Sequence, residues 1–149
     1  MTLIHAERDG KATWRLLGPN GLPLESFSVF ADSLLRKYAF HTRNSYCRNL
    51  AVFFDYVFEA TAALSLANAN EVLTRSLLRE VIESYDEYLV LGEASGKRIA
   101  RLVDASRPSP RHSPATSELM HATLRKFLRL SDQIRREMEE LTQLGLRQD

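Results

Sequence analysis

The hydrophobic and polar positions at the start of the chain indicate a β-hairpin. Two β-favouring runs flank Asp9-Gly10, a dipeptide typical of two-residue hairpin turns because both residues tolerate positive φ. A second turn signal at residues 18–21 closes the segment. We therefore predict a hairpin over residues 1–22. An isolated hairpin is only marginally stable in water, so we expect Trp14 to anchor it against the rest of the chain.

From Pro23 onward the hydrophobic residues recur at helical spacing. Pro23 suits the first turn of a helix, whose apolar face is formed by Phe27, Phe30, Ala31, Leu34 and Leu35. A second helix should follow a short connection over residues 38–41. Its two apolar stripes indicate a helix packed on two sides. They are formed by Tyr46, Leu50, Phe53 and Val57, and by Cys47, Ala51, Phe54 and Phe58. The small, uncharged residues 61–68 are predicted to be a connector.

Three further helices are predicted in the second half of the chain. They cover about residues 70–91, a short segment around residues 99–103, and a long stretch from Thr116 or Ser117 to Gly145. Three prolines within residues 106–114 predict an exposed, stiff loop before the last helix. The last helix carries apolar positions at heptad spacing. These are Met120, Leu124, Phe127, Ser131, Ile134, Met138 and Leu141, where only Ser131 interrupts the apolar set.

We thus expect a mainly α fold, a compact bundle of four to five helices preceded by the hairpin. Residues 1–22 form the hairpin and residues 23–145 the helical domain. The 149 residues suffice for one such core. The longest stretch without charge is eleven residues, against the roughly 20 that a membrane helix needs, so we expect no membrane segment. Cys47 is the single cysteine, which excludes an internal disulfide and favours the reducing cytoplasm.

The net charge is +1, but basic and acidic residues are segregated along the chain. Residues 36–48 hold four basic residues and no acidic one, and residues 97–111 hold five basic residues and one acidic one. Residues 55–93 hold eight acidic and two basic residues. Both basic blocks lie at loops or helix starts, where free amides and the helix dipole favour phosphate. Solvated surface charge gives the same pattern, so the pattern alone leaves both interpretations open.

Residues 24–60, LESFSVFADSLLRKYAFHTRNSYCRNLAVFFDYVFEA, resemble the N-terminal core-binding (SAM-like) domain of phage integrases and other tyrosine recombinases. In that family a Thr opens the second helix and is followed by Tyr, Leu and Phe, at the spacing of Thr42, Tyr46, Leu50 and Phe53 here. The segment SPATSELMHATLRKFLRL is similar to the family's final helix, and TWRLLGPNGLPLESF to a strand and turn that precede the first helix in one branch. The chain departs from the family at Ala39, usually a small polar residue, and at Ser117-Glu118, usually Asn-Arg.

The resemblance implies a domain that forms half of a clamp around double-stranded DNA, with the starts of the second and last helices facing the major groove. The residues that we expect to contact DNA are Lys37, Thr42, Arg43, Asn44, Arg48, Lys97, Arg98, Arg101, Arg107, Arg111, His121 and Arg125. Arg43 and Asn44 are side chains able to read base edges. The basic residues of 97–111 suit phosphates. His121 and Arg125 could read a base or lie in solvent.

We predict no catalysis by this chain. The recombinases that it resembles cleave DNA with a Tyr nucleophile and Arg, Lys and His residues of a separate C-terminal domain, which we expect to be absent here. The spacing of His41 and Arg43 does not match their His-x-x-Arg motif. Tyr85 and the last tyrosine, Tyr88, lie at helical spacing on the predicted buried face of the helix over residues 70–91, so we interpret them as core residues. No ligand spacing for a metal and no glycine-rich phosphate loop is found, so no cofactor or small-molecule substrate is expected.

The expected partners are therefore double-stranded DNA and other recombinase protomers, in the cytoplasm of a bacterial or phage-infected cell. An alternative of another class remains: a helical protein–protein interaction module that dimerises without binding DNA. The heptad spacing of the last helix supports it, because that spacing continues past the resemblance as far as Leu141. In that case the basic blocks are solvated surface.

Overall fold

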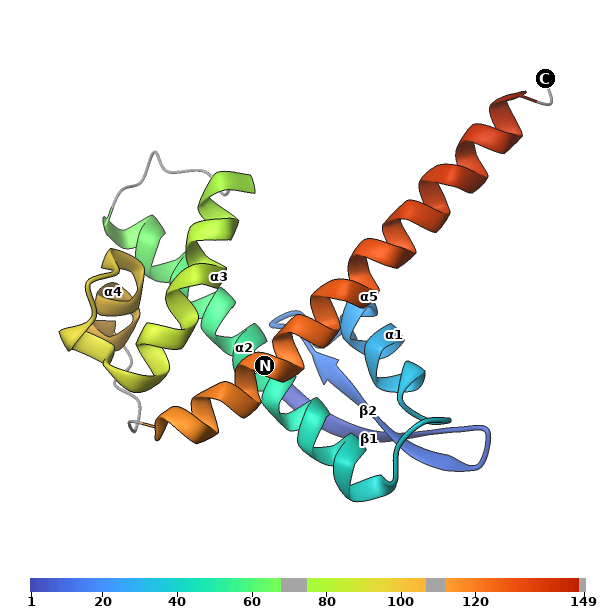
Figure 1. The fold of residues 1–149 in the computed structure, drawn as a ribbon, viewed down its shortest axis with the longest axis horizontal. Coiled ribbons are helices and arrows are strands. Elements are labelled where there is room, and N and C mark those ends of the chain that lie inside the picture. Colours follow the sequence, from blue (N-terminus) through green and yellow to red (C-terminus); the bar gives the residue numbers. More distant parts are fainter. Residues whose placement is uncertain (68–74, 107–111, 148–149) are drawn as a thin grey trace. The chain divides into compact units, whose positions relative to one another are not determined.

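The computed structural model describes residues 1–67, 75–106 and 112–147 (Figure 1). Its elements are β1 (Thr2–Arg8), β2 (Lys11–Leu17), α1 (Glu25–Ser33), α2 (Phe40–Ala67), α3 (Arg75–Val90), a 3-10 turn (Gly92–Ala94), α4 (Arg98–Ser106) and α5 (Pro114–Arg147). The prediction of a mainly helical chain behind a short N-terminal hairpin is confirmed. Within the described ranges, no helix is both long enough and apolar enough to cross a bilayer.

The hairpin forms as its turn dipeptide predicts. β1 and β2 pair antiparallel, and the last pair before the turn is Arg8 with Lys11. Asp9 and Gly10 both have positive φ, 53° and 76°, which a two-residue turn with the twist of the strands requires. Trp14 is 1% exposed and lies with its ring 5.4 Å from that of Phe40, so the predicted anchoring of the hairpin by Trp14 is confirmed.

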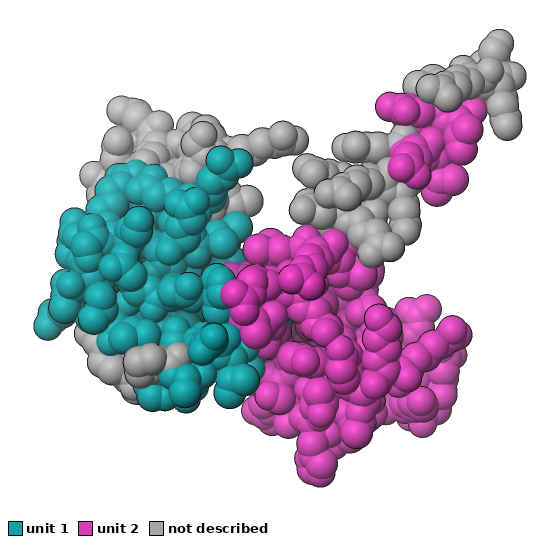
Figure 2. Space-filling model, in the orientation of Figure 1, with its two compact units in different colours: residues 1, 49–121 teal, residues 2–48, 122–149 magenta. Residues whose placement is uncertain are grey.

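The chain divides into two compact units, which are described separately (Figure 2). Unit 2 comprises residues 2–48 and 122–149: the hairpin, α1, the first turns of α2 and most of α5. Unit 1 comprises Met1 and residues 49–121: the rest of α2, α3, α4 and the first turns of α5. The hairpin therefore shares a unit with helices.

The core of unit 2 is built on the contact between β2 and α1. Leu16 of β2 and Phe27 and Phe30 of α1 are almost fully buried, and Phe30 meets Phe127 of α5 edge to face at 5.7 Å. Fully burying one such side chain contributes roughly 1.5–3 kcal/mol. This apolar contact fixes which side chains of the unit remain at its surface.

The core of unit 1 is an aromatic cluster between α2 and α3. The ring of Tyr85 lies 5.2 Å from that of Phe53 and 5.1 Å from that of Tyr56. The hydroxyls of Tyr56 and Ser84 are 2.5 Å apart, and burial raises the pKa of Tyr56 to about 12. The amphipathic α4 packs against α3. The interpretation of Tyr85 and Tyr88 as core residues is confirmed, since both are buried.

Several predicted boundaries are wrong. Pro23 lies outside α1 and instead forms a bridge with Leu17, so the helix starts at Glu25. The predicted connector continues α2 to Ala67, because its alanine and leucine residues are strong helix formers. Gly145 does not end α5, which runs to Arg147.

The start of α5 also differs from the prediction. Pro114 is its first residue, a position where the missing N–H is not needed. The preceding Ser113 accepts the N–H of Thr116 through its Oγ at 3.2 Å, so the cap lies three to four residues before the predicted one. Most of the predicted proline-rich loop lies outside the described residues.

Candidate nucleic-acid interface

The first turns of α2 present polar side chains to solvent because Cys47 and Leu50 turn the opposite face into the core. Thr42 and Arg48 are exposed, and Asn44 is half-buried beside them. Arg48 donates from Nε to Asn44 Oδ1 at 3.1 Å, one helical turn away. These two side chains thus form a donor-rich pair on the surface of unit 2. Lys37, in the preceding turn, is exposed as well.

Arg43 does not belong to this surface, although it was predicted to contact DNA. Its side chain is buried: the residue is 7% exposed. Nη1 donates to the carbonyl of Ala12 and Nε to that of Tyr38, and the guanidinium lies 5.9 Å from the Trp14 and Phe40 ring centroids. Arg43 therefore joins the hairpin to α2 instead of facing a ligand.

A lysine of α5 completes the surface of unit 2 beside the start of α2. Lys126 Nζ donates to the Tyr38 hydroxyl at 2.5 Å and lies 4.8 Å from the ring of Tyr38 and 5.4 Å from that of Tyr46. The hydrogen bond from Lys126 lowers the pKa of Tyr38, and the lysine charge acts in the same direction. The predicted contact Arg125 and its neighbour Arg129 are exposed on the same helix.

No local sequence signal could have identified this cluster. Tyr38 and Lys126 are 88 positions apart, and each belongs to a segment whose pattern is explained by helix packing alone. The basic residues Arg125, Lys126 and Arg129 are close together in the sequence, but only the packing of unit 2 brings Lys126 against Tyr38 and Tyr46. We name the exposed and half-buried residues described so far the α2–α5 surface: Lys37, Thr42, Asn44, Arg48, Arg125, Lys126 and Arg129.

The second basic block lies in unit 1, and part of it is engaged within the protein. Arg98 donates from Nε to Glu80 at 2.9 Å, and the hydrogen bond from Arg98 lowers the pKa of Glu80. Arg101 donates to the carbonyl of Ser95 at 2.9 Å. Lys97 is exposed. Arg107 and Arg111 lie outside the described residues.

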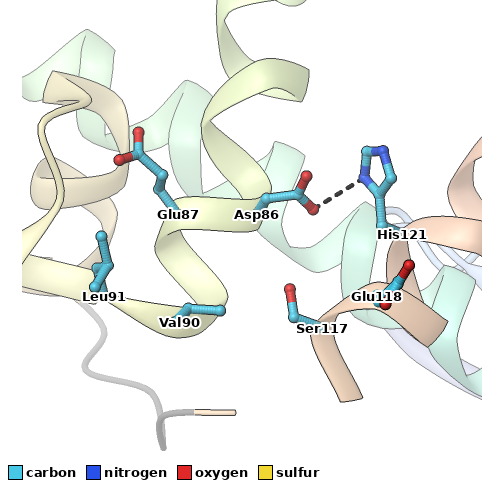
Figure 3. Close-up of a pocket in the computed structure, with 7 residues that line it drawn as sticks. All are labelled: Asp86, Glu87, Val90, Leu91, Ser117, Glu118 and His121. Atoms are coloured by element: carbon cyan, nitrogen blue, oxygen red, sulfur yellow. Dashed lines mark ion pairs between the residues drawn. The ribbon is translucent and has the colours of Figure 1, made fainter. Parts of the chain in front are cut away.

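The start of α5 in unit 1 borders an acidic pocket of about 400 Å³ (Figure 3). Three carboxylates line it, those of Asp86, Glu87 and Glu118, together with Val90 and Leu91. His121 faces Asp86 across it, with Nδ1 2.9 Å from Asp86 Oδ1. Carboxylates at this position repel phosphate, so His121 is placed to pair with Asp86 and not to receive an anion.

Three further residues, Cys47, His5 and Arg8, lie in settings that the structure describes. Cys47 is fully buried, and burial raises the pKa of its thiol to about 12, which makes it inert. His5 and Arg8 do have the His-x-x-Arg spacing, but in a strand residues three apart point to opposite faces. His5 packs near Trp14, while Arg8 binds Asp32. In the described ranges, no three or more His, Cys, Asp or Glu residues gather as metal ligands.

Comparison of the chain with models of protein families, with curated proteins and with solved structures found no match.

Proposed function

We propose that this chain binds double-stranded DNA, without cleaving it, through the α2–α5 surface of unit 2. The charge of that unit supports the proposal. Residues 2–48 and 122–149 of unit 2 hold thirteen Lys or Arg and nine Asp or Glu. Residues 49–121 of unit 1 hold seven Lys or Arg and ten Asp or Glu. Phosphate neutralisation supplies most of the affinity of non-specific DNA binding, so unit 2 is the better candidate.

The observation that carries the proposal is the fixed cation Lys126 next to an acid-free helix start. Its ammonium group is held by the Tyr38 hydroxyl and two aromatic rings, so less side-chain entropy is lost when it meets a phosphate. No acidic residue occurs between positions 33 and 54. A phosphodiester that approaches the first turns of α2 therefore meets cations without a competing carboxylate from this segment.

The residues of the surface divide by chemistry into two groups. Lys37, Arg125 and Arg129 are exposed cations suited to phosphates, which position a protein on DNA without reading its sequence. Arg48 and Asn44 have the donors and acceptors that pair with guanine and adenine edges in the major groove. Their mutual hydrogen bond holds both side chains on one side of the helix. We propose Asn44 as the base reader and Arg48 as its positioning partner, whose charge also neutralises a phosphate.

This function agrees with the recombinase resemblance of residues 24–60, and we propose the chain as a core-binding module of that kind. Its place would then be on DNA in the cytoplasm, beside other protomers of the recombinase. The exposed Lys97 of unit 1 remains a candidate for an additional phosphate contact. The charge surrounding Arg98 and His121 makes them weaker candidates.

Fluorescence anisotropy with a labelled 20-base-pair duplex tests the proposal. Five cations of the surface would give a slope of log affinity against log salt of about −4.5. Arg48→Gln should weaken binding and reduce the magnitude of that slope by about 0.9. Arg79→Gln is the matched control, since Arg79 is an exposed arginine of unit 1. Absence of binding at 50 mM salt, or an equal effect of both variants, would refute the proposal.

A second function is favoured by two apolar residues near the end of α5. Leu141 and Leu144 are 69% and 53% exposed and lie three residues apart, so they share a face of the helix. Such a face suits helix–helix association. Sedimentation velocity distinguishes the two functions. If the chain forms a dimer, if Leu141→Ser dissociates that dimer, and if the chain has no affinity for DNA, then it is an interaction module and not a DNA-binding one.

A further inference from the structure

Unit 2 contains a second basic feature, a pocket of about 930 Å³ between the hairpin and α1. Four cationic residues line it: Arg8, Lys11, Arg15 and Arg36. Arg8 and Arg36 are exposed, as is Lys11. None of the four belongs to the α2–α5 surface, and only Arg36 lies in a basic block of the sequence.

The half-buried carboxylate of Asp32 holds the wall of this pocket in place. It accepts two hydrogen bonds from Arg15, at 2.9 and 3.0 Å, one from Arg8 at 2.9 Å, and one from the buried hydroxyl of Thr13 at 2.9 Å. Burial alone would raise the pKa of Asp32, but the hydrogen bonds from Arg15, Thr13 and Arg8 outweigh it and lower that pKa. Asp32 is thus a positioning residue that orients two guanidinium groups.

The remaining charges leave the pocket positive. Asp32, Asp9 and Glu25 are the acidic residues among its lining, against the four cations. The Asp32 carboxylate is occupied by its four donors. Lys11 Nζ donates to the carbonyl of Leu35 at 3.4 Å, a long contact that leaves its other donors for a ligand. A group of one to two negative charges complements this lining better than a neutral or cationic one.

We propose that this pocket binds a phosphate group of the backbone of the same DNA duplex, an inference that rests on the proposed function. Its rim at Leu35 and Arg36 is followed at once by Lys37 and Tyr38 of the Lys126 cluster. Three residues span at most about 10 Å between Leu35 and Tyr38. One DNA strand carries a phosphate roughly every 3.4 Å along the helix axis, so a backbone on the α2–α5 surface brings phosphates within reach of the pocket.

The test is a salt titration of duplex binding with variants of opposite expected effect. If Lys11 and Arg36 each neutralise a phosphate, the wild-type slope becomes about −6, and Lys11→Gln combined with Arg36→Gln returns it to about −4.5. Glu25→Gln removes a lining carboxylate and should strengthen binding. Glu7→Gln is its control: it makes the same change on an exposed residue of the hairpin that does not line the pocket. Circular dichroism and Trp14 fluorescence verify folding.

The outcomes separate the two proposals. If the wild-type chain does not bind DNA, the proposed function fails and the pocket assignment fails with it. If wild type binds and Arg48→Gln weakens it, but the slope of the Lys11/Arg36 variant is unchanged or Glu25→Gln equals Glu7→Gln, only the pocket assignment is overturned. Inorganic phosphate that displaces DNA at micromolar concentration would also overturn it, in favour of a site for a free phosphate compound.

Discussion

Replacing Asp32 by alanine should destabilise unit 2 strongly, because one carboxylate satisfies donors from three residues. The hydroxyl of Thr13 is fully buried and would lose its acceptor. Arg15 would lose two parallel hydrogen bonds and keep only the one that it donates to the Trp14 carbonyl. Arg8 would lose the hydrogen bond that it donates to the carboxylate.

The expected cost follows from the exposure of each donor. A buried hydroxyl that loses a charged acceptor costs about 1.5–3 kcal/mol. The side chains of Arg15 and Arg8 are 21% and 59% exposed, so water replaces much of what they lose, and each adds about 1 kcal/mol or less. The free energy of unfolding should therefore fall by about 3 kcal/mol.

Urea unfolding followed by tryptophan fluorescence measures this cost. Trp14 is the single tryptophan and lies in unit 2, so its emission reports that unit. Thr13→Val removes the orphaned hydroxyl, so Asp32→Ala should cost roughly 1–2 kcal/mol less in that background. Glu7→Gln, a loss of charge on an exposed residue, should stay within about 0.5 kcal/mol. A cost below about 1 kcal/mol, or an equal cost in both backgrounds, would refute the reasoning.

The same variant carries a pH dependence whose sign is fixed by the lowered pKa of Asp32. A carboxyl with a folded pKa below its unfolded value of about 3.9 stabilises the fold fully above that value. This contribution is lost as the pH falls through the folded pKa. The difference in unfolding free energy between wild type and Asp32→Ala should therefore be constant from pH 5 to 7 and shrink below pH 4. A difference that grows toward low pH contradicts the assignment.

Three further outcomes are expected. Arg43→Ala leaves two backbone carbonyls without donors, so it should lower the free energy of unfolding measured in urea by about 2–3 kcal/mol. The DNA affinity per folded molecule should stay the same. A large loss of affinity without a loss of stability contradicts this. Lys126→Gln should raise the pKa of Tyr38 in a titration of phenolate absorbance and weaken DNA binding, whereas an unchanged Tyr38 titration would exclude their hydrogen bond. At pH 8, Cys47 should react with a thiol reagent in urea but not in the native protein, because its thiol is buried and burial raises its pKa to about 12. Rapid reaction of Cys47 in the native protein contradicts this.

Much of the fold could be predicted from local patterns. Asp9-Gly10 fixed the hairpin turn because positive φ is a property of those residues themselves. The apolar stripes of α2 and α3 predicted core positions such as Tyr85 because helical spacing decides which side chains share a face. Predicted boundaries are wrong where a residue suits two local structures. Pro23 suits the first turn of a helix, but it also suits the bridge to Leu17 of β2 that it forms in the structure.

The site could be predicted only in part, because charge in sequence does not tell where a side chain goes. Arg43 lies in an acid-free block like Arg48, but tertiary packing buries the first between hairpin and helix and leaves the second exposed. Asp32 and Lys126 acquire their roles from partners 17 to 88 positions away. Such long-range pairs have no signature in one sequence.

The most direct measurement of the central claim is a map of backbone amide shifts in the ¹⁵N-labelled chain when duplex DNA is added. The account predicts that the largest changes fall on residues 36–48 and 125–129 and disappear at high salt. Residues 80–90 of α3, with their carboxylates, should change little. Shifts concentrated on α3, or none on the first turns of α2, would contradict it.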